Sequence, residues 1–112
     1  MDINEFEATL ITKLSMLEFV EHWNITRKRT SLKVTVFLKK RSLLSVFYNM
    51  VLRIQSFALI INNERVWGLD RDNRLGWHEH PINNPEHHET VEPHTIDEII
   101  AKLKTVWDTL DR

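Results

Sequence analysis

Residues 32–39 read Leu32-Lys33-Val34-Thr35-Val36-Phe37-Leu38-Lys39, and they decide the fold class. Hydrophobic residues occupy every second position, a period typical of a strand that buries one face. The preceding residues 19–26 alternate in the same way. We therefore expect an antiparallel sheet, because such sheets commonly pack one face on the core and leave the other to solvent.

Three further strands are predicted after this stretch. Leu43–Leu52 and Ile54–Ile61 are apolar runs rich in β-branched and aromatic residues. Asn62-Asn63 signals a tight turn, and Arg65–Leu69 would complete the hairpin. Periodicity alone leaves open whether Leu43–Ile61 forms two strands or one long helix.

Helices are predicted at both ends of the chain. The first spans about Ile3–Ser15, and Asp2 followed by Glu5 fits a capping-box-like start. The second starts after Thr95, and its apolar stripe continues through Asp111. Between them, residues 70–94 hold all three prolines and five of the six histidines, so we expect a long loop there.

The expected architecture is a single α+β domain over residues 1–112. It comprises an N-terminal helix, an antiparallel meander of about five strands, a long His/Pro-rich loop and a C-terminal amphipathic helix. The 112 residues include no cysteine and only two glycines, which excludes disulfides, thiol nucleophiles and glycine-rich phosphate loops. No apolar stretch is long enough for a membrane span, and the acidic N-terminus does not resemble a signal peptide. We expect a cytoplasmic protein with no cofactor, no bound metal and no membrane partner.

Charge is distributed unevenly along the chain. Residues 22–63 carry eight basic side chains and no acidic one, whereas the segments on either side are net acidic. Clustered Lys and Arg attract a phosphate backbone, although a basic sheet neutralised by acidic helices is an open alternative. The candidate RNA-binding residues are Arg27, Lys28, Arg29, Lys33, Lys39, Lys40, Arg41 and Arg53.

Histidines supply the most concentrated chemical signal. In an extended segment His78 and His80 point the same way and Glu79 points away. The histidines could be acid–base groups, metal ligands (His78, His80 and His87) or structural partners of nearby glutamates. For catalysis without a metal the candidates are His78, His80, His87 and His88, with Arg71 or Arg74 stabilising the charge on phosphorus.

The charged turn before these histidines supplies candidate supporting residues. A carboxylate of Asp70 or Asp72 could fix an imidazole tautomer, and Asn73 belongs to the same turn. Trp67 and Trp77 flank the turn, where they would either stack on a base or close the core.

The C-terminal half carries a family resemblance. The stretches Trp67-Gly68-Leu69-Asp70-Arg71-Asp72-Asn73, Trp77-His78-Glu79-His80-Pro81 and Pro85-Glu86-His87-His88, followed by a capped helix, resemble the archaeal and bacterial TumE-like proteins. The likeness covers residues 64–112 well and the earlier residues only in element order. It implies the toxin of a toxin–antitoxin module, a ribonuclease-like activity and a partner antitoxin with a DNA-binding domain.

The leading hypothesis combines the two signals. Basic strands would hold RNA phosphates, and the histidine loop at their edge would cleave the RNA by metal-independent transesterification. The main alternative is a non-enzymatic interaction module whose basic strands bind an acidic partner or a second copy, giving a homodimer. A metal-binding protein is the third possibility. The sequence does not identify an RNA target, or which histidine is acid and which is base.

Overall fold

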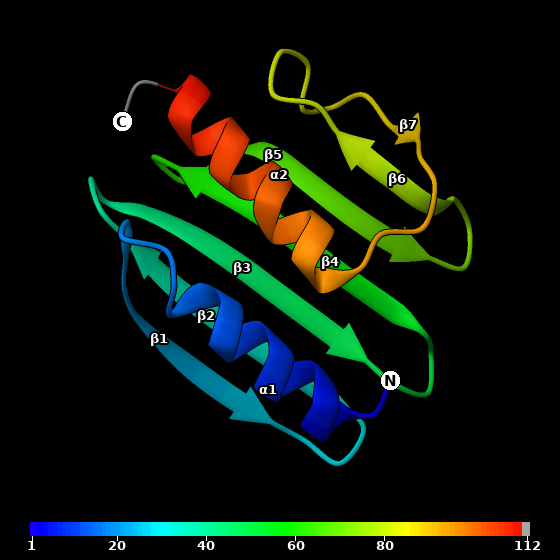
Figure 1. Ribbon diagram of the computed structural model, residues 1–112. Coiled ribbons are helices and arrows are strands. Elements are labelled where there is room, and N and C mark those ends of the chain that lie inside the picture. The colour runs from blue at the N-terminus through cyan, green and yellow to red at the C-terminus, as the bar shows by residue number, and fades with distance from the viewer. Residues whose placement is uncertain (111–112) are drawn as a thin grey trace.

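The computed structural model describes residues 1–110, in which two helices cover one face of a seven-stranded sheet (Figure 1). The helices are α1 (Ile3–Leu14) and α2 (Ile96–Thr109). The strands are β1 (Val20–Arg27), β2 (Ser31–Leu38), β3 (Ser42–Asn49), β4 (Ile54–Ile61), β5 (Glu64–Asp72), β6 (Gly76–His80) and β7 (Glu89–Thr90). Each strand pairs antiparallel with the next along the chain, so the α+β meander is confirmed.

The period of two in β2 decides which face is buried. Leu32, Val34, Val36 and Leu38 are at most 1% exposed and lie under the helices. Because paired residues of adjacent strands share a face, the same layer continues through Leu44, Val46, Phe57, Leu59, Trp67 and Leu69. The two helices add Phe6, Leu10, Leu14, Ile99, Leu103 and Trp107 to this core.

The prediction of about five strands was wrong, since the sheet has seven. The three prolines do interrupt the chain, but they lie at Pro81, Pro85 and Pro93, outside every strand. Gly76, with a φ of 67°, turns the chain after β5, and five residues remain for β6 before the first proline. The two-residue strand β7 then pairs with His78 and Glu79.

The open question about Leu43–Ile61 is settled in favour of two strands. β3 and β4 pair over their full length, from Ser42 opposite Ile61 to Asn49 opposite Ile54. The Asn49 side chain accepts hydrogen bonds from two backbone N–H groups of the connecting turn, and Arg53 adopts a φ of 57°. The predicted Asn62-Asn63 turn is present, with both residues at positive φ.

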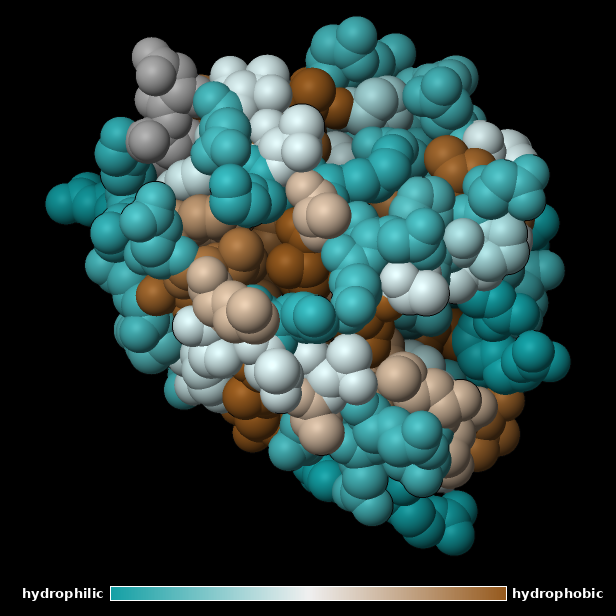
Figure 2. Space-filling model, in the orientation of Figure 1, coloured by the Kyte–Doolittle hydropathy of each residue, from teal (hydrophilic) through white to brown (hydrophobic). Residues whose placement is uncertain are grey.

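Both helices begin where their capping residues predicted. The Asp2 side chain accepts from the Glu5 N–H, and Thr95 and Glu98 form a complete capping box. α1 ends at Leu14, one residue before the predicted end, and Asp111 lies outside the described residues. Within residues 1–110 no helix is long and apolar enough to cross a membrane. In Figure 2, hydrophobic residues show between the two helices amid a mostly hydrophilic surface.

Candidate functional site

The sheet face opposite the helices, here called the open face, carries the site. Both helices pack on the other face, and the exposed Lys33 and half-buried Phe47 alternate with core residues along β2 and β3. Pairing places Phe47 opposite Ser56, Ser56 opposite Asp70, and Asp70 opposite His78. A cross-strand row of side chains therefore runs along the open face from the basic strand β2 to β6.

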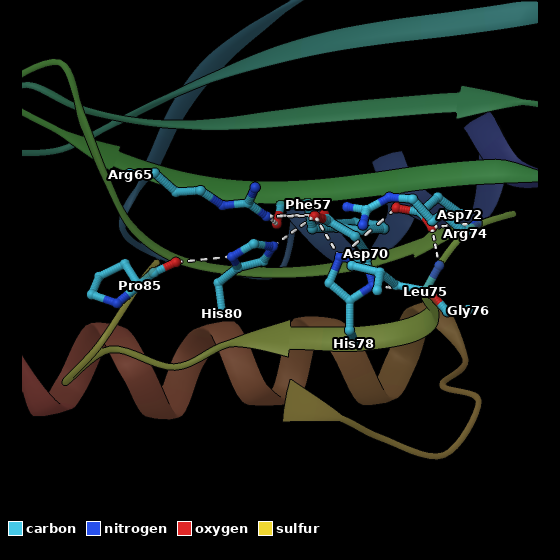
Figure 3. Close-up of polar contacts among 10 residues, drawn as sticks. All are labelled: Phe57, Arg65, Asp70, Asp72, Arg74, Leu75, Gly76, His78, His80 and Pro85. Carbon is cyan, nitrogen blue, oxygen red and sulfur yellow. Dashed lines mark hydrogen bonds and ion pairs between the residues drawn. The ribbon is translucent and has the colours of Figure 1, made fainter. Parts of the chain in front are cut away.

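Asp70, His78 and His80 form a tight group at the end of this row, which we call the cluster (Figure 3). One Asp70 oxygen, Oδ2, lies 3.2 Å from His80 Nε2 and 3.6 Å from His78 Nε2. The side chains of His78 and His80 are only 4% and 9% exposed. Alternation along β6 puts both histidines on this face, as predicted, and turns Glu79 toward the helices.

Backbone carbonyls fix the tautomer of both buried histidines. Nδ1 of His78 lies 3.0 Å from the Gly76 carbonyl oxygen, and Nδ1 of His80 lies 2.8 Å from that of Pro85. A carbonyl only accepts hydrogen bonds, so we assign the proton to Nδ1 in each ring. Each Nε2 is left to face Asp70, and in a neutral ring it presents a lone pair there.

Arg65 reaches Asp70 along β5, while the two histidines reach it from β6 (Figure 3). Its Nη2 donates to Oδ1 at 3.0 Å and to Oδ2 at 2.9 Å, and it also reaches the Phe57 carbonyl at 3.4 Å. The guanidinium passes over Gly68, where a β-carbon would lie 1.9 Å from Nη2. Gly68 is therefore required for this ion pair. The Arg65 Nε is buried without a hydrogen-bond partner among the described residues.

Asp72 adds a second carboxylate beside the cluster. Its Oδ1 accepts from the backbone N–H groups of Leu75 and Arg74, and these hydrogen bonds lower the pKa of Asp72 despite some desolvation. Its Oδ2 lies 4.0 Å from His78 Nε2. Asp72 thus closes the β5–β6 turn and keeps negative charge next to His78.

His88 covers the cluster from the solvent side. Its ring centroid lies 4.6 Å from that of His80 and 5.3 Å from that of His78, while the residue itself is exposed. Desolvation, followed by the charges of His80 and His78, lowers the pKa of His88. His88 is thus the most accessible imidazole of the three.

The other candidate site residues lie elsewhere. His87 is exposed, and its backbone N–H donates to the Asn84 carbonyl. Arg71 and Trp77 face the helix side, where they line a cleft of ≈ 600 Å³. Trp67 is fully buried in the core. Of the two predicted cations, only Arg74 is on the cluster's side of the turn, where its charge acts on His88.

The basic residues do not form one continuous patch. Arg27 pairs with Glu7 of α1 on the helix side. One end of the sheet carries Lys28 and Arg29 in the β1–β2 turn and Arg53 in the β3–β4 turn. The other end carries the β2–β3 turn, with Lys39, Lys40 and Arg41. Lys33 is the one candidate that projects from the open face, because it pairs with Phe47 in the cross-strand row.

Arg65 was missed by sequence reasoning. Gly68 was an available signal, because a glycine inside a strand often marks the close approach of another group. The remaining predicted residue of the turn, Asn73, donates from Nδ2 to the Leu52 carbonyl and ties this turn to the β3–β4 turn.

No protein-family model, curated protein or solved structure matches the chain. A fold class alone supports many functions, so the geometry and chemistry of the site are what indicate the function.

Proposed function

We propose that the protein binds single-stranded RNA on the open face and cleaves it beside the cluster, acting as the toxin of a toxin–antitoxin pair. The observation that carries this proposal is the cross-strand row, which joins Lys33 and Phe47 to Asp70 and His78. With strands about 4.8 Å apart, the row extends ~14 Å from β2 to β5. The row connects one residue of the basic segment, Lys33, with the candidate histidine His78.

The row offers the two contacts that unstructured RNA requires. Phe47 is half-buried and can stack on a base, and the exposed Lys33 directly opposite can pair with a phosphate. Phe37 lies on the same face and already stacks on His22, with ring centroids 4.4 Å apart. Aromatic side chains on an exposed sheet face are a common platform for single-stranded RNA.

The proposed reaction is attack by an RNA 2′-oxygen on the adjacent phosphorus. The 2′-hydroxyl loses its proton, the new O–P bond forms, and the departing 5′-oxygen gains a proton. His88 is the accessible imidazole for one proton transfer, which is worth ~10²–10⁴ in rate. The Arg74 guanidinium supplies positive charge near the reacting phosphate.

Binding is tested with a fluorescent single-stranded RNA. Phe47→Leu keeps an apolar side chain but removes the ring, and should weaken binding at least about fivefold, since stacking contributes ~1–3 kcal/mol per base. Lys33→Ala should lower the slope of log affinity against log salt by about 0.7. The matched control is Lys104→Ala on α2, which removes the same charge on the helix side. If Lys33→Ala and Lys104→Ala change the salt dependence of RNA affinity equally, the open face is not the RNA-binding surface.

Cleavage is tested with the same RNA and by induced expression in bacteria. The wild-type chain and His87→Ala should cut RNA and arrest growth, whereas His88→Ala should lose both effects at equal protein level and equal melting temperature. Full activity of His88→Ala, or an inactive wild type, would reject the catalytic proposal.

The apolar part of the open face favours a second candidate, a protein-interaction module. Leu43, Phe47 and Ile60 are half-buried there and no helix covers them. A partner antitoxin or a second copy of the chain would bury them. This function predicts no RNA binding at low salt, together with a complex or dimer that Phe47→Asp dissociates in light scattering.

A further inference from the structure

The Nε2 atoms of the two buried histidines, His78 and His80, both face the Asp70 carboxylate. This carboxylate has no proton to donate to either of them. Asp70 accepts from Arg65 through both oxygens, which is the arrangement of an ionised carboxylate. The His78 and His80 protons are assigned to Nδ1, so neutral rings turn two lone pairs toward Asp70 Oδ2. Three electron-rich atoms that face one another in a buried place repel each other, and a cation between them would remove that repulsion.

We propose that Asp70, His78 and His80 bind one divalent transition-metal ion of the zinc type. The inference goes beyond the proposed RNA cleavage and does not depend on it, because it concerns what the cluster holds. It also departs from the metal-independent reaction expected from the sequence.

Distances between the ligand atoms fit a metal site better than a hydrogen-bond network. The three ligand atoms lie within 4.8 Å of one another, and Asp70 Oδ2 is 3.2 Å and 3.6 Å from the two Nε2 atoms. A contact of 3.6 Å is too long for a hydrogen bond. Ligands bonded at about 2.0–2.1 Å in a tetrahedron are about 3.3–3.4 Å apart, close to both separations.

The surroundings of the cluster have the form of an outer coordination sphere. Metal-binding histidines usually donate their second ring N–H to a carbonyl or carboxylate, and both rings here donate Nδ1–H to backbone carbonyls. The ligating carboxylate is usually hydrogen-bonded too, and Arg65 supplies those bonds. Ring orientation is thus fixed before any ion arrives.

The types of ligand also suit a cation. Asp70 and Asp72 place two carboxylates within 4.0 Å of His78 Nε2, with Arg65 paired to Asp70 and the charge of Arg74 acting on Asp72. Two imidazoles and one carboxylate are a ligand set used for zinc, and for iron with open positions. Three protein ligands leave at least one coordination position, on which a water or a phosphate oxygen could bind.

The first experiment measures metal binding by the complete, tag-free protein. After chelator treatment and dialysis against Zn²⁺, mass spectrometry of the metal content should give one Zn²⁺ per chain, with a raised melting temperature. Asp70→Asn and His80→Gln should each weaken binding at least about tenfold. His87→Ala is the matched control, since it removes an exposed histidine of the connection that follows β6 and should bind like the wild type.

A second measurement uses the wild-type chain, in case the variants fail to fold. In ¹⁵N NMR of the imidazoles, Zn²⁺ should shift Nε2 of His78 and His80 and leave their Nδ1 atoms protonated. Failure of the folded wild type to bind Zn²⁺ or Co²⁺ stoichiometrically overturns the site. Undiminished binding by Asp70→Asn, or shifts confined to His87 and His94, also overturns it. Metal binding without RNA cleavage would leave this inference intact and reject the proposed function.

Discussion

Replacing Gly68 by alanine should dislodge Arg65 from Asp70. The new β-carbon would lie 1.9 Å from Arg65 Nη2 and 2.4 Å from Nε, far inside contact distance. The guanidinium is the mobile end of a long side chain, so it would swing away rather than distort the sheet. The backbone accepts alanine, because among the described residues Gly76 is the glycine with a positive φ.

The expected cost follows from two opposing contributions. Hydrogen bonds to a charged group are worth ~1.5–3 kcal/mol, and the lower part of this range applies because the Arg65 side chain is 30% exposed. Its unpaired buried Nε would regain water, which reduces the cost further. Alanine at a compatible position also stabilises by ~0.4–1 kcal/mol through the unfolded state. Gly68→Ala should therefore destabilise the chain by about 1 kcal/mol.

A double-mutant cycle makes this reasoning refutable. With Arg65→Ala in place, the alanine at position 68 meets no guanidinium, so Gly68→Ala should stabilise by ~0.4–1 kcal/mol. The substitution thus changes sign between the two backgrounds. Urea unfolding followed by tryptophan fluorescence measures all four free energies. Equal effects in both backgrounds, within ~0.5 kcal/mol, would show that Arg65 does not occupy the space over Gly68.

Three further predictions concern the helix side. Leu103→Ala should cost ~2–5 kcal/mol in urea unfolding, because Leu103 is fully buried; a loss below ~0.5 kcal/mol would contradict that packing. Glu79→Ala should cost ~1–3 kcal/mol, more than Glu79→Gln, because it leaves the buried Trp67 N–H without its acceptor 2.9 Å away. Hydrogen bonds with the Thr95 backbone and side chain lower the pKa of Glu98. The ionised Glu98 carboxylate therefore stabilises the fold fully above the ordinary carboxyl pKa, and this contribution is lost as pH falls through the lowered pKa. Glu98→Gln should therefore lose less stability than the wild type over that acidic range. If the unfolding free energies of the two proteins fall in parallel with pH, the prediction is contradicted.

Local patterns predicted most of the fold. The alternation over residues 32–39 identifies the buried face of β2, and capping residues identify the starts of both helices. β6 and β7 were missed because three prolines were read as excluding strands from the whole segment. Proline prevents pairing only where its missing N–H is needed, and all three lie in connections.

The candidate site was predictable only in part. Alternation alone places His78 and His80 on one side, but it does not reveal which residues they face. That depends on the register of β5 and β6, where Asp72 opposite Gly76 sets Asp70 opposite His78. The basic segment shows the same limit, because consecutive turns of a meander lie at opposite ends of the sheet and separate residues that are close in sequence.

Ordered histidines in a proline-rich segment are explained by alternation within β6. Its two faces are anchored separately. On the helix side, Glu79 accepts from Trp67 in the core and from Lys102 of α2 at 2.8 Å, and these bonds lower its pKa although burial opposes its ionisation. On the open face, His80 is tied to the Pro85 carbonyl, so the proline-rich connection folds back over the cluster rather than away from it. The strand that carries the candidate ligands is therefore positioned by the core and by α2, and the open face is left for an ion or a substrate to occupy.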